Sequence, residues 1–247
     1  MSVDGKSYWE RAAELGYSKA MFGSPAVERH VNGRLHRLAV DIGLRLGLDR
    51  SSRILDLGCG DGTFANGVLA GHFQSIDGFD LSEPSIHRAQ AGSPGPQVRF
   101  QVGDVTQLDF AELPTYDGAF LIGILHHIKP SAPKVIKALR GIARRVVVLE
   151  PNGNHLLRRL LELTPSYKEA GEASFRGRDL CGLFEAAGYS KIVHFRCNIF
   201  PNFTPEFLFR LIRPLEPAIE GAPGLRALCT VDMFGFRADD EPSSLPV

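Results

Sequence analysis

The strongest constraint on the fold is a regular alternation of short apolar runs with helical patterns between residues 53 and 150. Strand patterns cover 53–57, 75–80, 98–102, 118–123 and 145–150. Helical patterns cover 63–70 and 131–144, and Ser82 is placed to cap a helix after the second strand. Strands that alternate with helices form parallel, doubly wound sheets. We therefore expect an α/β chain, and we expect the strand at 145–150, which is apolar from Val146 to Leu149, to be central.

Before this alternation, the sequence predicts a helix that starts at Ser24, with Pro25 in its first turn. Apolar residues then recur every three or four positions along one helix face, at Val27, Val31, Leu35, Leu38, Ile42 and Leu46. His30 and Arg34 share another face, which we assign to solvent. Residues 1–50 are thus expected to form a helical N-terminal cap.

After residue 150 the pattern becomes looser, although 191–199 and 229–237 read as two further strands. We expect a main domain over 51–238, helical insertions at about 153–173 and 200–228, and a flexible tail over 239–247. Phe203 and Phe207 lie four residues apart in the second insertion. They could form an apolar lid over a flat or lipid-like ligand, or simply pack in a core.

The composition indicates which kinds of binding partner and which cellular compartment to expect. The 247 residues contain 28 Lys and Arg against 28 Asp and Glu, so no nucleic-acid partner is expected. The four cysteines have no CxxC spacing, which predicts no metal site and a reducing compartment. The first twenty residues have no apolar segment of the kind found in signal peptides, so none is expected, and no apolar run approaches the ~20 residues that a membrane span needs. We expect a cytoplasmic protein without a membrane partner, and the oligomeric state stays open.

The motif with the clearest chemistry is DLGCGDG, from Asp56 to Gly62, directly after the first strand. Glycines there let the backbone approach a ligand closely. A dinucleotide-binding motif would place a glycine where this chain has Thr63, and the GK[ST] of a phosphate-binding loop is absent. The carboxylate of Asp56 suits a ligand that carries an ammonium group, so the ligand is expected to be cationic at this point.

Two more acids follow the next two strands. Asp80 ends the second strand, where an acid hydrogen-bonds the hydroxyls of a ribose. Asp104 follows the third strand and could accept from an exocyclic amine of adenine, or could simply form a turn. Anchors for an ammonium group, a ribose and an adenine together describe S-adenosylmethionine.

With these motifs in order, the sequence resembles the class I S-adenosylmethionine-dependent methyltransferases. The resemblance lies in LDLGCGDG (55–62), GFDLSE (78–83), VGDV (102–105) and YDGAFLIGILHHI (116–128). It implies a Rossmann-like, doubly wound, seven-stranded and mostly parallel sheet with an antiparallel last strand. It also implies that Gly58 and Gly60 face the methionine part of the cofactor, that Leu121 and Ile122 lie near the sulfonium, and that Val105 lies beside the adenine. Leu81 completes the cofactor-binding residues that we expect.

His126 and His127 follow the fourth strand, where the acceptor site of this family opens. Either imidazole could deprotonate an acceptor hydroxyl, or could instead hydrogen-bond the adjoining loop. Glu150 and His155 could orient an acceptor or cap the next helix. Tyr167 in the first insertion could line the pocket. Tyr8 and Trp9 resemble aromatic residues that fold over the cofactor in some relatives, and packing within the cap is the alternative.

The resulting hypothesis is an S-adenosylmethionine-dependent methyltransferase that acts on a small-molecule acceptor, most readily at oxygen. The alternatives are an RNA or protein methyltransferase, or a regulatory protein that binds the cofactor without catalysing transfer. A nicotinamide oxidoreductase is disfavoured by Asp56 and Thr63.

Overall fold

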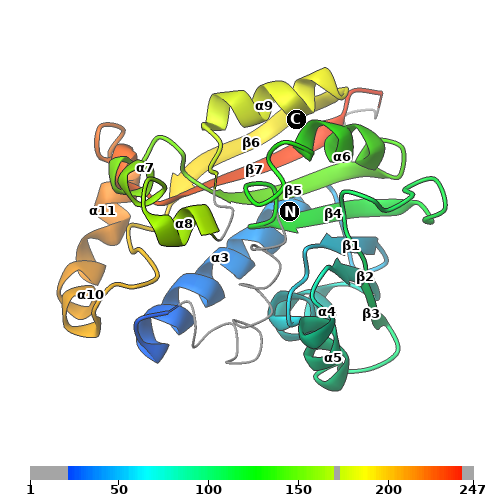
Figure 1. Ribbon diagram of the computed structural model, residues 1–247, viewed down its shortest axis with the longest axis horizontal. Helices are drawn as coiled ribbons and strands as arrows, with labels where there is room; N and C mark the ends of the chain where they lie inside the picture. The colour runs from blue at the N-terminus through cyan, green and yellow to red at the C-terminus, as the bar shows by residue number, and fades with distance from the viewer. Residues whose placement is uncertain (1–21, 170–172, 241–247) are drawn as a thin grey trace.

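The computed structural model describes residues 22–169 and 173–240, which form a single seven-stranded sheet flanked by helices (Figure 1). The strands are β1 (Arg53–Leu57), β2 (Ser75–Asp80), β3 (Val98–Val102), β4 (Tyr116–Ile122), β5 (Ala143–Pro151), β6 (Tyr189–Cys197) and β7 (Val231–Ala238). Their order is β3-β2-β1-β4-β5-β7-β6, and only β7 runs antiparallel to its neighbours. The predicted fold class is therefore confirmed. Strand order reverses between β1 and β4, where open α/β sheets bind their ligands.

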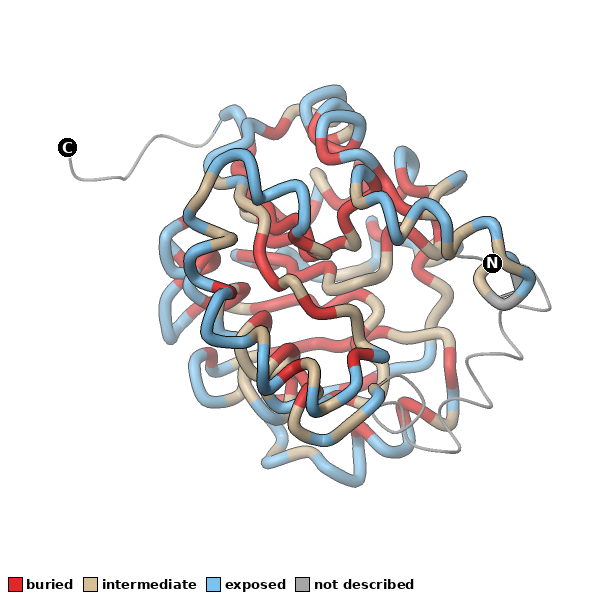
Figure 2. Tube along the Cα trace, turned by 90° about the vertical axis from the view of Figure 1, so that its left-hand side faces the viewer, coloured by how far each residue is buried: buried red, intermediate tan, exposed pale blue. Residues whose placement is uncertain are grey.

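Helices cover both faces of the sheet, and each face has its own apolar layer (Figures 1 and 2). One face carries α3 (Pro25–Arg45), the π-helix η1 (Ala65–Leu69), α4 (Ala70–His72) and α5 (Glu83–Ala91). The other carries α6 (Ala132–Leu139) and α9 (Gly177–Ala186). Because side chains alternate along a strand, neighbouring β4 residues enter different layers: Phe120 packs on the α3 side and Leu121 on the α6 side.

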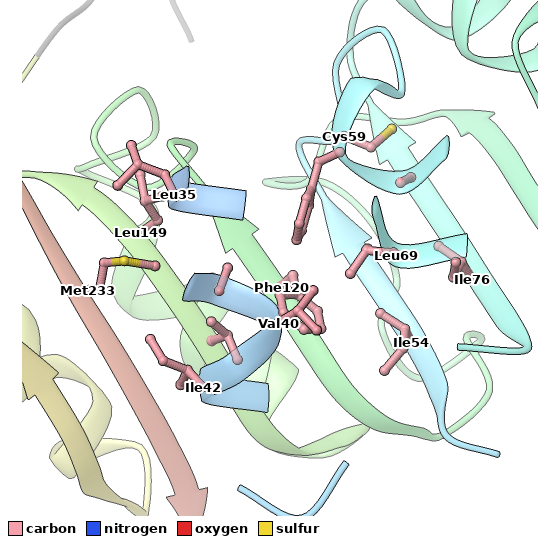
Figure 3. Packing of buried hydrophobic residues seen from close by; sticks show 14 of the residues in the cluster. Leu35, Val40, Ile42, Ile54, Cys59, Leu69, Ile76, Phe120, Leu149 and Met233 are labelled. Carbon is pink, nitrogen blue, oxygen red and sulfur yellow. The ribbon is translucent and has the colours of Figure 1, made fainter. Parts of the chain in front are cut away.

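Helix α3 forms as its sequence predicts. The Ser24 hydroxyl accepts a hydrogen bond from Val27 N at 3.3 Å, which caps the first turn. The apolar face lies directly on the sheet, and Figure 3 shows Leu35, Val40 and Ile42 of α3 in the layer that contains Phe120 and Met233. Burying each such side chain stabilises the fold by roughly 1.5–3 kcal/mol. The helix is therefore part of the main core.

Some predicted boundaries are wrong. The helix expected over 131–144 ends at Leu139, and β5 begins four residues later at Ala143. A short turn intervenes, in which Ile142 N donates to Leu139 O at 3.0 Å. Arg144, which the predicted helix included, is therefore a strand residue. Arg145 is a strand residue as predicted, and it pairs with Gly118 of β4. Strands β4 and β6 each start two residues before the expected position.

The two insertions contain short helices that gather on one side of the molecule, at the left of Figure 1. The first holds α7 (Leu156–Leu161) and α8 (Pro165–Glu169). The second holds α10 (Glu206–Ile212), the 3₁₀ turn η2 (Arg213–Leu215), α11 (Glu216–Gly221) and the 3₁₀ turn η3 (Leu225–Leu228). None of the described helices combines the length and the apolar composition needed to cross a membrane.

Two carboxylates of α11 fasten the second insertion to α3. Glu216 is buried and accepts from His30 Nε2 at 2.7 Å and from Arg34 Nη1 at 3.1 Å. Glu220 pairs with the same guanidinium and also accepts from the backbone N–H of Asn198 at 2.6 Å. The assignment of His30 and Arg34 to solvent is therefore wrong. Their partners lie more than 180 residues away in sequence, so no local pattern could identify them.

Candidate functional site

A cavity of about 510 Å³ opens at the carboxyl ends of β1, β2 and β4. Its volume lies within the range of about 300–1,000 Å³ that is usual for small-molecule sites. Loops at the strand ends form one part of its wall, and α3 and the two insertions form the rest. Most of the residues predicted for the site meet here.

Asp56, in β1, brings a buried carboxylate to the cavity. Its side chain is 1% exposed, and Oδ2 has no hydrogen-bond partner among the described residues. Burial, and secondarily the nearby Asp80, raises the pKa of Asp56 to about 7. A dry carboxylate without a counter-ion is a favourable partner for an incoming cation. The site therefore fits a ligand with an ammonium group.

The glycine-rich loop after β1 is held against β2, because Gly58 N and Cys59 N both donate to Phe79 O, at 2.8 and 3.1 Å. Gly58 has φ +75, and a Cβ there would lie 2.8 Å from Ile124. Gly60 has φ +54, and a Cβ there would meet nothing within 4 Å. Gly58 is thus required by its neighbours, whereas Gly60 faces open space that a ligand can occupy.

The carboxylate of Asp80, at the end of β2, both shapes this loop and lines the cavity. Oδ2 accepts from Gly60 N and Oδ1 accepts from Ser82 N, each at 2.9 Å. Burial raises the pKa of Asp80, and these two hydrogen bonds oppose that rise. Leu81 lines the cavity beside it. Its contact with a ribose stays a prediction.

Asp104 and Val105, after β3, also reach the cavity. Asp104 forms the turn that we considered as the alternative, because Oδ1 accepts from Thr106 N at 2.9 Å and from Thr106 Oγ1 at 2.8 Å. Val105 is buried and provides an apolar wall. The turn fixes the direction of the carboxylate, and contact with adenine stays a prediction.

Of the two β4 residues expected near the sulfonium, the structure brings only Ile122 to the cavity. Leu121 is fully buried in the layer formed by α6 and α9, and it is not one of the lining residues. The reason is the two-residue period of a strand, which sends adjacent side chains to opposite faces. The cofactor-facing position of Leu121 is therefore corrected to a core position.

His126 and His127 both line the cavity, and their ring centroids lie 3.9 Å apart. Glu150, at the end of β5, holds this segment with three hydrogen bonds. Its Oε1 accepts from Leu125 N at 2.8 Å, and its Oε2 lies 3.2 Å from His126 N and 2.7 Å from His126 Nδ1. Glu150 is 1% exposed, so this carboxylate is committed to positioning the loop and the imidazole.

In the first insertion, His155 takes the capping role that we considered for it. Its Nδ1 accepts from Arg158 N at 3.4 Å, and burial lowers its pKa. His155 also lines the cavity, as does Tyr167, whose ring lies 5.0 Å from the Arg158 guanidinium. Tyr8 and Trp9 lie outside the described residues.

Sequence reasoning missed the wall contributed by α3 and by the start of the second insertion. Asn32 and His36 lie one helical turn apart on α3 and face the cavity, and Phe200 and Asn202 face it from the segment after β6. The His36 ring lies 4.7 Å from the Phe64 ring, and burial lowers the pKa of His36 to about 4. The i, i+4 spacing of two polar residues beside an apolar face was the available signal.

The four cysteines are free and buried, and burial raises the pKa of the Cys59 thiol. Cys59 is therefore a packing residue within the loop. In the part of the chain that the structure describes, no three His, Cys, Asp or Glu side chains are grouped to hold a metal ion.

Comparisons with known proteins agree with this geometry. A family model described as a methyltransferase domain matches residues 29–194. O-methyltransferase resE of Aspergillus sclerotiorum is 34% identical over 131 residues, which are 51% of this chain and 47% of that protein. The S-adenosyl-L-methionine-dependent Diels-Alderase iccD of Talaromyces variabilis is 29% identical over 167 residues, 62% of this chain and 54% of that protein. The chain thus spans about half the length of the curated relatives it matches.

The fold is shared with solved structures. Magnesium protoporphyrin IX methyltransferase of Synechocystis PCC 6803, crystallised with SAH, superposes with a TM-score of 0.60 at 16% identity, covering 87% of this chain and 88% of that one. At that identity the likeness concerns the fold alone. Taken with the family match over most of the sheet, it confirms the resemblance noted in the sequence. The chain belongs to the class I S-adenosylmethionine-dependent methyltransferases.

Proposed function

We propose that this protein transfers a methyl group from S-adenosylmethionine to an oxygen atom of a small-molecule acceptor. The observation that carries the proposal is the lining of the cavity. The strand ends bring the carboxylate of Asp56, whose Oδ2 has no partner among the described residues, and the open space at Gly60. Helix α3 and the insertions add apolar side chains such as Leu35 and Phe203 together with polar ones such as Asn32 and His155. The O-methyltransferases among the relatives support oxygen as the acceptor atom. The free thiols support a reducing, cytoplasmic setting.

The residues that would hold the cofactor come from the ends of β1 to β4. Asp56 would pair with the ammonium group, Asp80 with the ribose hydroxyls and Asp104 with the adenine. The rest of the surface would come from Gly58, Gly60, Leu81, Val105 and Ile122. When bound, the cofactor supplies an electrophilic methyl group on a positively charged sulfur. The chain contributes mainly by holding an acceptor oxygen close to that methyl group and in line with it.

The acceptor hydroxyl must also lose a proton, and we assign this role to one of the histidines after β4, because both line the cavity. Glu150 fixes the His126 ring, and His127 packs against it at the cavity wall. Imidazole titrates near neutral pH, so either ring can take the proton as the oxygen attacks.

The test is an assay that measures methyl transfer to candidate acceptors. The purified protein is incubated with S-adenosylmethionine and a panel of hydroxylated aromatic and polyketide-like compounds, with RNA and peptide substrates in parallel. A product that gains one methyl on oxygen, together with demethylated cofactor, is the expected result. Methylation of RNA or peptide alone would overturn the choice of acceptor. Cofactor binding by calorimetry without transfer to any substrate would favour a regulatory protein.

A second candidate is suggested by the Diels-Alderase relative, whose match extends over more of this chain than that of the O-methyltransferase resE. In this candidate the cofactor stays intact and the apolar end of the cavity folds a reactive polyene for cycloaddition. The same assay separates the two activities. A cyclised product of unchanged mass with no consumption of cofactor supports cycloaddition, whereas methylated product supports transfer.

A further inference from the structure

Two polar side chains of α3, Asn32 and His36, line the cavity and make no hydrogen bond to any of residues 22–169 and 173–240. They lie one turn apart on the same face of the helix, and we call them the α3 pair. Val31 and Leu35, their neighbours in the chain, are buried in the core at 3% and 6% exposure. The helix therefore presents these two polar groups to the cavity from a wall that packing holds in place.

Other polar side chains of the wall already have hydrogen bonds within the protein. Asn198 lines the cavity, but its Nδ2 donates to Phe200 O and to Thr230 Oγ1, each at 2.8 Å. His155 lines it too, and its Nδ1 accepts from Arg158 N. A group that folding has already satisfied gains little from a ligand, whereas a desolvated group without a partner gains a full hydrogen bond. The α3 pair is therefore better suited to bind a polar group of a ligand.

The α3 pair lies between the cofactor loop and the second insertion. The His36 ring is 4.7 Å from the ring of Phe64, which follows the glycine-rich loop. Two residues before Asn32, the ring of His30 is 6.0 Å from that of Phe200, at the start of the second insertion. A methyl acceptor has to lie beside the cofactor and against the rest of the wall. This stretch of α3 therefore borders the space that the acceptor would occupy.

Both groups of the α3 pair are uncharged at neutral pH. Burial lowers the pKa of His36 to about 4, so its neutral imidazole offers one donor and one acceptor. The amide of Asn32 also offers both. The carboxylate of Asp61, which lines the cavity, acts electrostatically on His36 and disfavours a second anion beside it. The α3 pair thus suits a hydroxyl or carbonyl group better than a carboxylate.

From this arrangement we infer that Asn32 and His36 hydrogen-bond a neutral hydroxyl or carbonyl oxygen of the acceptor, distinct from the oxygen that is methylated. The acceptor class is then a compound with a second oxygen substituent. By binding that substituent, the α3 pair orients the acceptor and determines which oxygen meets the methyl group. The inference rests on the proposed function, because it assigns part of the same cavity to the acceptor. The pair has a specificity-determining role and takes no part in proton transfer.

The experiment measures ligand binding by calorimetry, with the full chain saturated with demethylated cofactor, so that no turnover is needed. The probes are naphthol, which has a single oxygen, and a series of naphthalenediols with the second hydroxyl at different ring positions. Asn32→Leu and His36→Phe remove the hydrogen-bonding atoms and keep the approximate size of each side chain. His87→Phe is the control, because His87 is exposed on α5 and does not line the cavity. Thermal unfolding and S-adenosylmethionine affinity are measured for every variant.

We expect the wild type to bind at least one naphthalenediol about tenfold more tightly than naphthol. Asn32→Leu and His36→Phe should each reduce this preference by roughly threefold to tenfold. Their affinities for naphthol and for S-adenosylmethionine should stay the same, and His87→Phe should keep the wild-type preference. A wild type that prefers no diol would overturn the inference, as would a preference that both α3 substitutions leave unchanged.

A further arm separates the acceptor from the cofactor, whose carboxylate is another oxygen-bearing group. If the α3 substitutions weaken binding of S-adenosylmethionine but not of its decarboxylated analogue, the α3 pair binds the cofactor and the inference is overturned. The proposed function is judged separately, by incubating the bound diol with S-adenosylmethionine. A diol that binds through the α3 pair but gains no methyl group would support the subsite and contradict the proposed transfer.

Discussion

The carboxylate of Glu150 and the imidazole of His126 form a buried pair at the cavity wall, with 2.7 Å between Oε2 and Nδ1. A carboxylate offers only acceptor atoms, so Nδ1 carries the hydrogen in this pair. Glu150 also accepts two backbone N–H groups from the same loop. A side chain of β5 therefore orients the His126 ring, which belongs to the loop after the neighbouring strand β4.

Replacing Glu150 with Gln should lower turnover by roughly tenfold to a hundredfold, because the amide cannot hold both the loop and the imidazole. Cofactor affinity should stay unchanged, since Glu150 does not line the cavity. The decisive measurement is a double-mutant comparison with His126→Gln. If Glu150 acts through His126, Glu150→Gln has no further effect once His126 is replaced. Independent, multiplying losses would show that the pair does not work as a unit.

Asp80→Asn tests the ribose anchor. The amide keeps an acceptor oxygen for the loop but loses the charge, so the dissociation constant for S-adenosylmethionine should rise by roughly tenfold to a hundredfold. Calorimetry measures this change. Asp109→Asn is the control, because Asp109 is exposed, accepts from Ala111 N at 3.0 Å and does not line the cavity. Equal affinity in both variants would remove Asp80 from the cofactor site.

Gly60→Val should abolish cofactor binding by filling the open space beside the loop. The substitution also places a branched side chain at φ +54, which costs about 1–2 kcal/mol of stability. Gly188→Val separates the two effects, because Gly188 has φ +84 at the end of α9, away from the cavity. Both variants should be destabilised, and only Gly60→Val should fail to titrate with cofactor. A normal titration would contradict the assignment of the loop.

Asp56 gives the protein a pH dependence whose sign is opposite to that of most carboxylates. Its pKa is raised from 3.8 to about 7 in the folded chain, so the folded state holds the proton more tightly than the unfolded state. The stability that this protonation contributes is present at low pH and is lost as the pH rises through about 7.

Asp56→Asn should therefore raise the melting temperature of the cofactor-free protein at about pH 8 by about 3 °C or more, and by much less near pH 4. The same substitution should weaken cofactor binding, although it stabilises the cofactor-free protein. In the wild type, affinity increases as Asp56 ionises, and in the variant it is weak at every pH. Differential scanning calorimetry and titration across this range measure both effects. Parallel melting curves for the two proteins at all pH values would show that Asp56 is not held protonated.

The approximate positions of the strands along the chain could be predicted, because most of them are short apolar runs followed by a turn or a helix cap. The boundary after α6 could not, because residues 140–144 fit both the last turn of a helix and the start of a strand. The strand begins at Ala143, which pairs with Tyr116, and pairing is a property of the sheet that no local pattern shows.

That Asp56, Asp80 and Asp104 meet at one cavity could be predicted for the same reason, because each lies at or just after the end of a recognisable strand. The motif over 116–128 predicts a strand, but it does not show which side chains of that strand point to which face of the sheet. Leu121 was therefore predicted at the cavity although it packs in the core. The pairing of Glu150 with His126 and of Arg34 with Glu216 joins segments 24 and 182 residues apart, and neither contact leaves a local pattern. The cavity walls formed by α3 and the second insertion are held by such contacts between distant segments.

The two ends of the cavity rest on different supports. Asp56 and Asp80 belong to β1 and β2, inside the sheet, where substitutions would disturb the core. Much of the remaining wall comes from the segments between β5 and α9 and between β6 and β7, and Glu216 and Glu220 attach the second of these segments to α3. Substitutions in these segments can therefore reshape one part of the cavity without altering the strand ends that carry Asp56 and Asp80.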